Sequence, residues 1–129
     1  MSGMHDPVVL IVDDNEKNLR LARDVLQAAG LTTLEAASGA EGVAVAIEHD
    51  PDVILMDIRL PDMDGSHAMR LLRDDERTAA TPVVALTSLA MKGDREWLLS
   101  VGFDGYLEKP IDVRAFPGQV REYVLDPAD

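Results

Sequence analysis

The stretch Val8-Val9-Leu10-Ile11-Val12-Asp13-Asp14 runs from an uninterrupted apolar segment directly into two acids. Two later segments have the same build: Val53-Ile54-Leu55-Met56 ends on Asp57, and residues 82–86 end on Thr87. Apolar, largely β-branched runs without polar alternation are typical of strands that are buried on both faces. Such strands occur in parallel sheets that lie between two layers of helices.

Segments with helical spacing separate these strands. Apolar residues recur every three or four positions in residues 19–29, 43–47, 68–72 and 91–101. Two weaker strands are predicted at 32–36 and 106–108, and a last helix at 113–125 contains Pro117, which should kink or shorten its start. We therefore expect an α/β fold of the (βα)5 type, with a doubly wound parallel five-stranded sheet.

The length of the chain fits one domain. The 129 residues contain no cysteine, which argues against a disulfide scaffold, and no apolar run approaches the roughly 20 residues of a membrane span. No secretory signal pattern opens the sequence. We expect a domain over residues 7–125, flexible ends at 1–6 and 126–129, a cytoplasmic location and no membrane contact.

The charge of the chain is strongly acidic. Twelve Lys and Arg residues stand against twenty-four Asp and Glu residues, a formal net charge of −12. The basic residues are scattered singly among acids, and an acidic surface repels the phosphate backbone of nucleic acids. Direct binding of DNA or RNA is therefore not expected.

Polar side chains stand where the predicted strands stop. Any one of them is explained by a turn or a helix cap, but five at the same edge of a parallel sheet would share one crevice: Asp13, Asp14, Asp57, Thr87 and Lys109. Three neighbouring carboxylates repel one another unless a cation neutralises them, and carboxylate oxygens suit Mg²⁺. With an ammonium and a hydroxyl added, the crevice suits a phosphoryl group.

Four motifs carry a resemblance to a known family. They are Val-Asp13-Asp14-Asn, Leu-Met-Asp57-Ile-Arg-Leu-Pro-Asp-Met-Asp-Gly65, Ala-Leu-Thr87-Ser88 and Tyr106-Leu-Glu-Lys109-Pro110. In this spacing the chain resembles the receiver domain of two-component and phosphorelay response regulators, including the single-domain, chemotaxis-regulator type. The resemblance implies a flavodoxin-like sheet with strand order 2-1-3-4-5.

The resemblance also implies a role for each residue of the crevice. Asp57 would accept a phosphoryl group from a sensor histidine kinase or a histidine phosphotransfer protein. Asp14 would bind Mg²⁺ directly and Asp13 largely through water, with Asp57 and the backbone carbonyl of Arg59 as further ligands. Lys109 would bind a phosphoryl oxygen and balance charge during the transfer.

Further residues would couple phosphorylation to binding. Thr87 and Tyr106 would form the switch, the Lys109–Pro110 peptide bond would be cis, and Arg59 and Leu89 would set the phosphoryl lifetime, which we expect to be long. A partner-binding face would include the residues around the fourth helix and fifth strand: Ala90, Met91, Tyr106 and Glu108.

The function expected from these features is a phosphoacceptor switch that changes its partner-binding face. Such a chain would not be a conventional enzyme, although it would catalyse its own phosphotransfer and slow self-dephosphorylation. It would act on a downstream protein, as a monomer or weak dimer, either as a complete regulator or as part of a larger one. The alternative is a Mg²⁺-dependent phosphatase with an aspartyl nucleophile, similar to haloacid-dehalogenase-type enzymes, but Arg59 stands where those enzymes carry a second acid.

Overall fold

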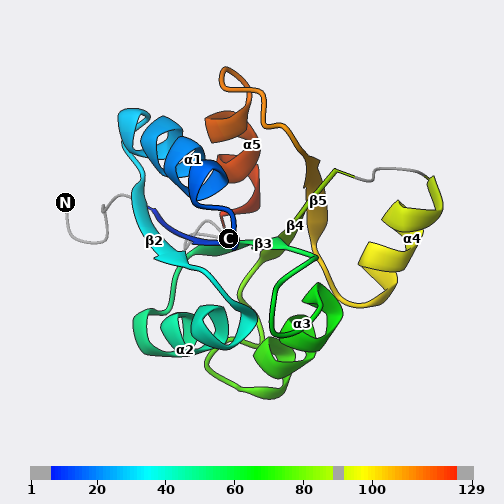
Figure 1. Ribbon diagram of the computed structural model, residues 1–129. Coiled ribbons are helices and arrows are strands. Elements are labelled where there is room, and N and C mark those ends of the chain that lie inside the picture. The colour runs from blue at the N-terminus through cyan, green and yellow to red at the C-terminus, as the bar shows by residue number, and fades with distance from the viewer. Residues whose placement is uncertain (1–6, 89–91, 125–129) are drawn as a thin grey trace.

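Five strands form one parallel sheet in the computed structural model, which describes residues 7–88 and 92–124. The strands are β1 (Val8–Val12), β2 (Thr32–Ala36), β3 (Val53–Asp57), β4 (Val83–Thr87) and β5 (Gly105–Glu108). Their order across the sheet is β2-β1-β3-β4-β5 (Figure 1). The predicted flavodoxin-like order is therefore confirmed.

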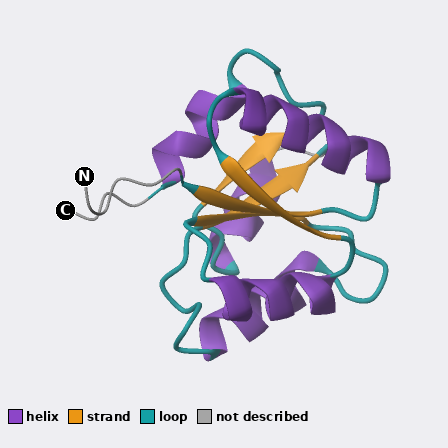
Figure 2. Cartoon of the chain, turned by 90° about the vertical axis from the view of Figure 1, so that its left-hand side faces the viewer, coloured by secondary structure: helices purple, strands orange, loops and turns teal. Residues whose placement is uncertain are grey.

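Helices alternate with the strands and cover both faces of the sheet. They are α1 (Glu16–Ala28), α2 (Gly39–His49), α3 (Gly65–Asp74), α4 (Lys92–Ser100) and α5 (Phe116–Tyr123). Figures 1 and 2 show α1 and α5 on one side of the sheet and α2 and α3 on the other. The β–α–β connections are those of a doubly wound sheet.

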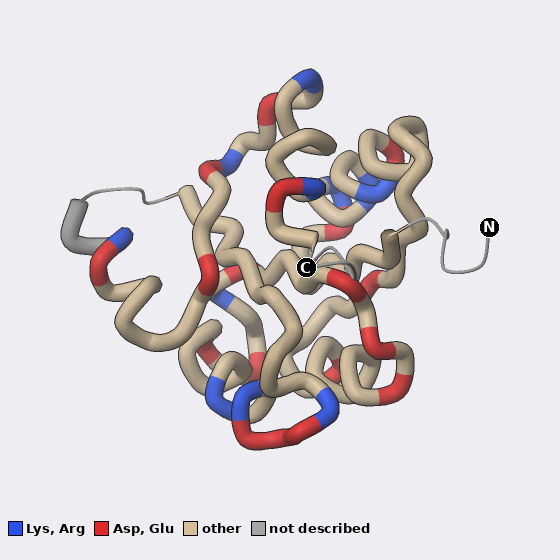
Figure 3. Tube along the Cα trace, turned by 180° about the vertical axis from the view of Figure 1, so that it is seen from behind, with Lys and Arg blue, Asp and Glu red and all other residues tan. Residues whose placement is uncertain are grey.

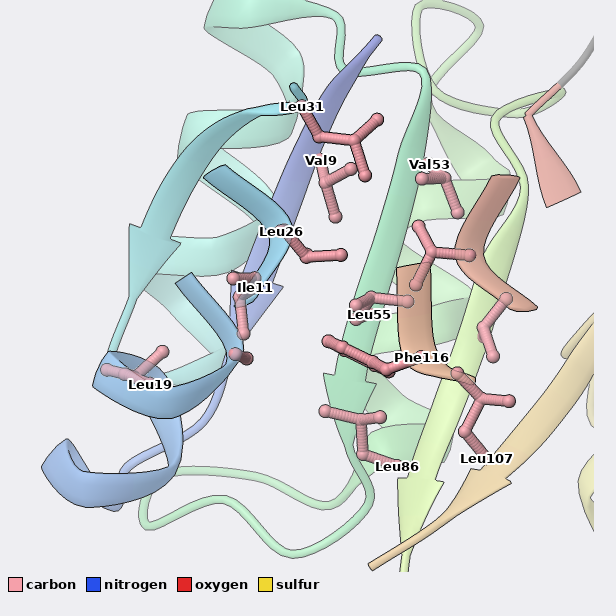
Figure 4. Close-up of a cluster of buried hydrophobic side chains, with 13 residues drawn as sticks. Val9, Ile11, Leu19, Leu26, Leu31, Val53, Leu55, Leu86, Leu107 and Phe116 are labelled. Atoms are coloured by element: carbon pink, nitrogen blue, oxygen red, sulfur yellow. The ribbon is translucent and has the colours of Figure 1, made fainter. Parts of the chain in front are cut away.

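The central strands bury alternate side chains in two separate cores. On β1, Val9 and Ile11 contribute to the core beneath α1 and α5, whereas Leu10 and Val12 contribute to the core on the opposite face. Figure 4 shows the first of these cores, in which Phe116 of α5 packs among side chains of the sheet. Because both faces are covered, β1, β3 and β4 need no polar alternation, which is why their sequences are continuously apolar.

The last helix is shorter than its sequence pattern predicted. We expected helix from residue 113, but α5 begins at Phe116, with Pro117 in its first turn. Before it, the Asp112 carboxylate accepts hydrogen bonds from the backbone N–H groups of Arg114 and Ala115 and holds a turn. A proline is tolerated in the first turn because its missing N–H has no partner there, so Pro117 marks the start of the helix.

The register of the sheet brings the polar strand ends together. Val12 of β1 pairs with Met56 of β3, so Asp13 and Asp57 follow at the same level of neighbouring strands. On the other side, Thr87 pairs with Glu108, and the Lys109 N–H donates to the Thr87 carbonyl oxygen at 2.8 Å. The carboxyl edge of the sheet therefore gathers residues from four separate parts of the chain.

The remaining expectations about surface and ends concern charge and membrane contact. Among the described residues, no helix is both long and apolar enough to cross a bilayer. Basic positions are spread over several elements with acidic positions between them (Figure 3). Residues 1–6 and 125–129 lie outside the described part of the chain, so the predicted flexible ends remain predictions.

Candidate functional site

A cavity of about 330 Å³ opens at the carboxyl edge of the sheet. Its lining includes all five polar residues that end the predicted strands, together with Arg59. Asp13, Asp57 and Thr87 are buried, at 1%, 9% and 2% exposure, whereas Asp14 is exposed. The site is therefore a polar hollow with a buried floor and an acidic rim.

The Lys109 ammonium lies between two carboxylates. Its Nζ is 2.7 Å from Oδ2 of Asp57 and 2.9 Å from Oδ2 of Asp13. Burial disfavours the charged ammonium and is the largest single influence, but the hydrogen bonds and charges of Asp57 and Asp13 together outweigh it and raise the pKa of Lys109. Lys109 is thus a fixed positive charge at the floor of the cavity.

The remaining carboxylate oxygens at the floor are held by backbone groups. The Asn15 N–H donates to Oδ1 of Asp13 at 2.9 Å, and the Arg59 N–H donates to Oδ1 of Asp57 at the same distance. Each N–H lies two residues after the acid that it binds, the spacing of an Asx-turn. These turns fix the direction of both carboxylates before any ligand arrives.

Three carboxylates of the site could bind one metal ion together. Oxygen atoms of Asp13, Asp14 and Asp57 all lie within 4.8 Å of one another. Hard divalent cations prefer such oxygen donors, and Mg²⁺ typically takes one or two carboxylates and retains several waters. The donor set therefore suits Mg²⁺ better than a soft transition metal.

Tyr106, the other predicted switch residue, lies away from this cavity. Its half-buried side chain lines a separate hollow between β5 and α5 together with Tyr123 and the exposed Glu108. The guanidinium of Arg95 on α4 lies 5.6 Å from the centre of the Tyr106 ring, within the range of a cation–π contact. A contact from α4 thus holds the Tyr106 ring at the surface edge of β5.

Some of the predicted residues are only partly accounted for. The Lys109–Pro110 peptide bond is cis, the conformation that the resemblance implied. Leu89, Ala90 and Met91 lie outside the described residues, so their predicted roles remain predictions.

The cavity has further lining residues besides the acids, Thr87 and Lys109. Ser88 after β4, which belongs to the motif Ala-Leu-Thr87-Ser88, contributes to its wall. Asn15 and Asn18 at the start of α1, for which no role was predicted, also contribute. Asn15 caps α1 by accepting from the N–H groups of Lys17 and Asn18. Asn15 follows Asp13 and Asp14 directly, and asparagine is a preferred helix cap. This pattern could have indicated that Asn15 lies beside the cavity, because a cap places the start of the helix next to the acids that end the strand.

Comparison with known proteins agrees with this geometry. The family model for the response regulator receiver domain matches residues 9–121. The chain is 44% identical to the polar-differentiation response regulator DivK of Brucella ovis over 118 residues, which cover 92% of this chain and 96% of DivK. It is 42% identical to DivK of Brucella anthropi over 118 residues, which again cover 92% of this chain and 96% of that protein.

Solved structures show the same fold. The chemotaxis response regulator CheY4 of Vibrio cholerae superposes with a TM-score of 0.87 at 28% identity, over 92% of this chain and 99% of CheY4. A second structure is the receiver domain of the sensor histidine kinase PA1611 from Pseudomonas aeruginosa, solved with a magnesium ion in its active-site cleft. It superposes with a TM-score of 0.83 at 34% identity, over 92% of this chain and 97% of that receiver domain. With its matching fold, strand-end acids and Lys109, the chain belongs to the response regulator receiver domain family.

Proposed function

We propose that this receiver domain is a phosphoacceptor switch in which Asp57 takes a phosphoryl group from a histidine kinase or a histidine phosphotransfer protein. The observation that carries the proposal is the Lys109 ammonium, 2.7 Å from Asp57 at the floor of an open polar cavity. A carboxylate held in place beside a fixed cation suits attack on a phosphoryl group, because the reaction depends mostly on positioning and charge stabilisation.

The transfer requires one bond to form as another breaks. An oxygen of Asp57 would bond to phosphorus while the bond from phosphorus to the donor's imidazole nitrogen breaks and its electron pair leaves with the imidazole. The Arg59 N–H, bound to Oδ1, keeps the carboxylate oriented. The Lys109 ammonium would then bind the phosphoryl oxygen on which negative charge develops.

The carboxylate cluster supports Mg²⁺ as the cofactor. Asp13, Asp14 and Asp57 supply three oxygens close enough for one ion, and the family resemblance adds the carbonyl of Arg59. A bound Mg²⁺ would neutralise phosphoryl oxygens and offset the repulsion between the acids.

Adding Mg²⁺ should raise the melting temperature of the chain. The ion binds the folded site and not the unfolded chain, so at ten times its Kd it adds about 1.4 kcal/mol, roughly 3–6 °C for a domain of this size. Asp14→Ala should lose most of this shift, as measured by differential scanning calorimetry with and without the ion. Asp24→Ala, which removes an exposed acid on α1, is the control; an undiminished shift in Asp14→Ala would mean that the ion binds elsewhere.

Phosphorylation in the cavity would change the separate surface around Tyr106 through Thr87 and Tyr106. Thr87 is buried at the cavity, and Tyr106 of the neighbouring strand lines the hollow beside α5. A conformer in which the Thr87 hydroxyl reaches the phosphoryl group would be favoured, and Tyr106 would leave its contact with Arg95. The face that includes Tyr106 and Glu108, with the predicted Ala90 and Met91, would then present a changed surface to a protein partner.

Thr87→Ala should accept the phosphoryl group but fail to transmit the change. In the parent, phosphorylation should shift the amide resonances of Tyr106 and Glu108. In Thr87→Ala the same shifts should be less than about half of those in the parent, because the hydroxyl that would stabilise the switched conformer is missing. Two-dimensional NMR before and after treatment with acetyl phosphate measures this. Equal shifts in the two proteins would rule out coupling through Thr87.

The phosphoryl lifetime is proposed to depend on Arg59 and Leu89. The exposed Arg59 lines the cavity, where a long side chain can cover the path of an attacking water. An apolar residue at position 89 offers that water no hydrogen bond, so we propose slow self-dephosphorylation.

The experiment that tests the proposed function also separates it from the phosphatase alternative. The chain is incubated with Mg²⁺ and acetyl phosphate, and in parallel with Mg²⁺ and several phosphate esters, and both the intact mass and the released phosphate are followed. A switch should gain a single phosphoryl group and release phosphate slowly. Rapid, continuous release from several phosphate esters without a mass gain would favour the phosphatase and overturn the proposal.

A further inference from the structure

The loop that follows the phosphoacceptor strand is closed at its base. It runs from Ile58 to Asp64, between β3 and α3, and the Gly65 N–H donates to the Ile58 carbonyl oxygen at 2.9 Å. Arg59 and Asp64 form an isolated antiparallel bridge across it. Asp64 then caps α3 by accepting from the N–H of His67. These contacts join the two ends of the loop to each other and do not involve its tip.

The tip of the loop is fastened to a different element, α2. The carboxylate of Asp62 accepts from the Gly39 N–H through Oδ1 at 2.8 Å and from the Ala40 N–H through Oδ2 at 2.9 Å. Gly39 and Ala40 are the first two residues of α2, whose N–H groups have no partner within the helix. The hydrogen bonds from Ala40 and Gly39 lower the pKa of Asp62, so the carboxylate is ionised at neutral pH.

Packing at the same point supports this contact. A Cβ atom built on Gly39 would lie 2.5 Å from Cγ and 2.7 Å from Sδ of Met63, so the Met63 side chain packs directly against the backbone of Gly39 and would have to shift if this residue carried a Cβ. Asp62 and Met63, neighbours at the tip, thus both contact the α2 start. Figure 1 shows α2 and α3 side by side on the same face of the sheet, with this loop leading into α3.

We propose that Asp62 is a positioning residue for phosphotransfer: by joining the loop tip to α2, it holds Arg59, and through Arg59 the carboxylate of Asp57. The proposal rests on the proposed function, because Arg59 donates its N–H to Asp57 there and its carbonyl oxygen would bind Mg²⁺. Asp62 does not line the cavity, so it would act through the loop. Loss of the Asp62 carboxylate should let the tip leave α2 and let the Arg59 N–H leave Asp57 more often.

The chain offers a matched control for this idea at the same helix end. Ser38 also caps α2, with its Oγ accepting from the Glu41 N–H at 3.1 Å, but it belongs to the segment before the helix and not to the loop. Ser38→Ala and Asp62→Ala each remove a cap from α2. Only Asp62→Ala releases the loop that carries Arg59. A residue that merely stabilises α2 would behave as Ser38 does.

The test compares the full chain with Asp62→Ala, Asp62→Asn and Ser38→Ala. In metal-free protein, amide hydrogen exchange at Arg59 and Gly65 should be about three- to tenfold faster in Asp62→Ala, as expected for loss of hydrogen bonds to an exposed carboxylate. The Kd for Mg²⁺, measured by calorimetry, should rise by about the same factor. Asp62→Asn, which keeps one oxygen acceptor, should lie between the parent and Asp62→Ala. Ser38→Ala should lower the melting temperature without a selective change at Arg59.

Each outcome decides the proposal. Unchanged exchange at Arg59 in Asp62→Ala, an equal change in Ser38→Ala, or faster exchange with an unchanged Mg²⁺ affinity would overturn the positioning role. If the parent chain binds no Mg²⁺, the proposed function loses its cofactor, and exchange at Arg59 alone then decides whether Asp62 holds the loop.

Discussion

Lys109→Met should lower the rate of phosphorylation by acetyl phosphate about 100- to 1000-fold, the usual cost of removing a charged donor that stabilises a transition state. Its ammonium contacts the carboxylates of both Asp57 and Asp13, and methionine fills similar space without charge. The initial rate of mass gain in saturating Mg²⁺ measures the effect. The melting temperature in metal-free buffer should also fall, because Asp13 and Asp57 would remain buried without their cation.

The control for this variant is Lys17→Met. Lys17 is exposed in the first turn of α1 and does not line the cavity, so its replacement changes the net charge equally but leaves the site intact. Because the pKa of Lys109 is raised, its contribution to stability should persist through neutral pH and be lost only as the pH rises through that raised value. A Lys109→Met rate within a few-fold of the Lys17→Met rate would contradict the role of Lys109 in the transfer.

Asp57→Asn should abolish phosphoryl uptake at the cavity while leaving the fold at least as stable as the parent. An amide oxygen is not a nucleophile toward phosphorus under these conditions, so the mass should not change with acetyl phosphate and Mg²⁺. In metal-free buffer, one of three clustered carboxylates becomes neutral and the repulsion between them falls. Urea unfolding measures the stability, and intact mass measures the uptake.

Asp74→Asn provides the comparison for this variant, since Asp74 is an exposed acid at the end of α3. It should accept the phosphoryl group as the parent does. Uptake of a full phosphoryl group by Asp57→Asn would assign the acceptor to another residue. A clear loss of stability in metal-free buffer would contradict the view that the three acids repel one another.

The fold could be predicted because its signals are local and strong. Continuous apolar runs such as Val53–Met56 indicate strands buried on both faces, and helical spacing fills the intervals between them. The strand order came from the family resemblance, because periodicity does not say which strands are neighbours. The start of α5 was predicted three residues early, since a tertiary turn held by Asp112 replaced the helix there.

The site could be predicted as a set of residues but not as a network of contacts. Parallel strands end at one edge, so Asp13, Asp57 and Lys109 were expected to share a crevice. The contact of one ammonium with two acids depends on the register of β1 with β3, which the sequence does not state. The link from Asp62 to Gly39 spans 23 positions and joins a loop to a helix end, so no local pattern could reveal it.

The identity of the phosphoacceptor can be read from the unaltered chain. Acyl phosphates are reduced by borohydride, which converts a phosphorylated aspartate into homoserine and leaves free carboxylates unchanged. The parent is treated with acetyl phosphate and Mg²⁺, reduced, digested and sequenced by tandem mass spectrometry. We expect homoserine at position 57 and aspartate at positions 13 and 14. Homoserine at position 13 or 14 would contradict the assignment of Asp57 as the phosphoacceptor. So would the absence of homoserine at every position when the intact mass has shown that the chain was phosphorylated before reduction.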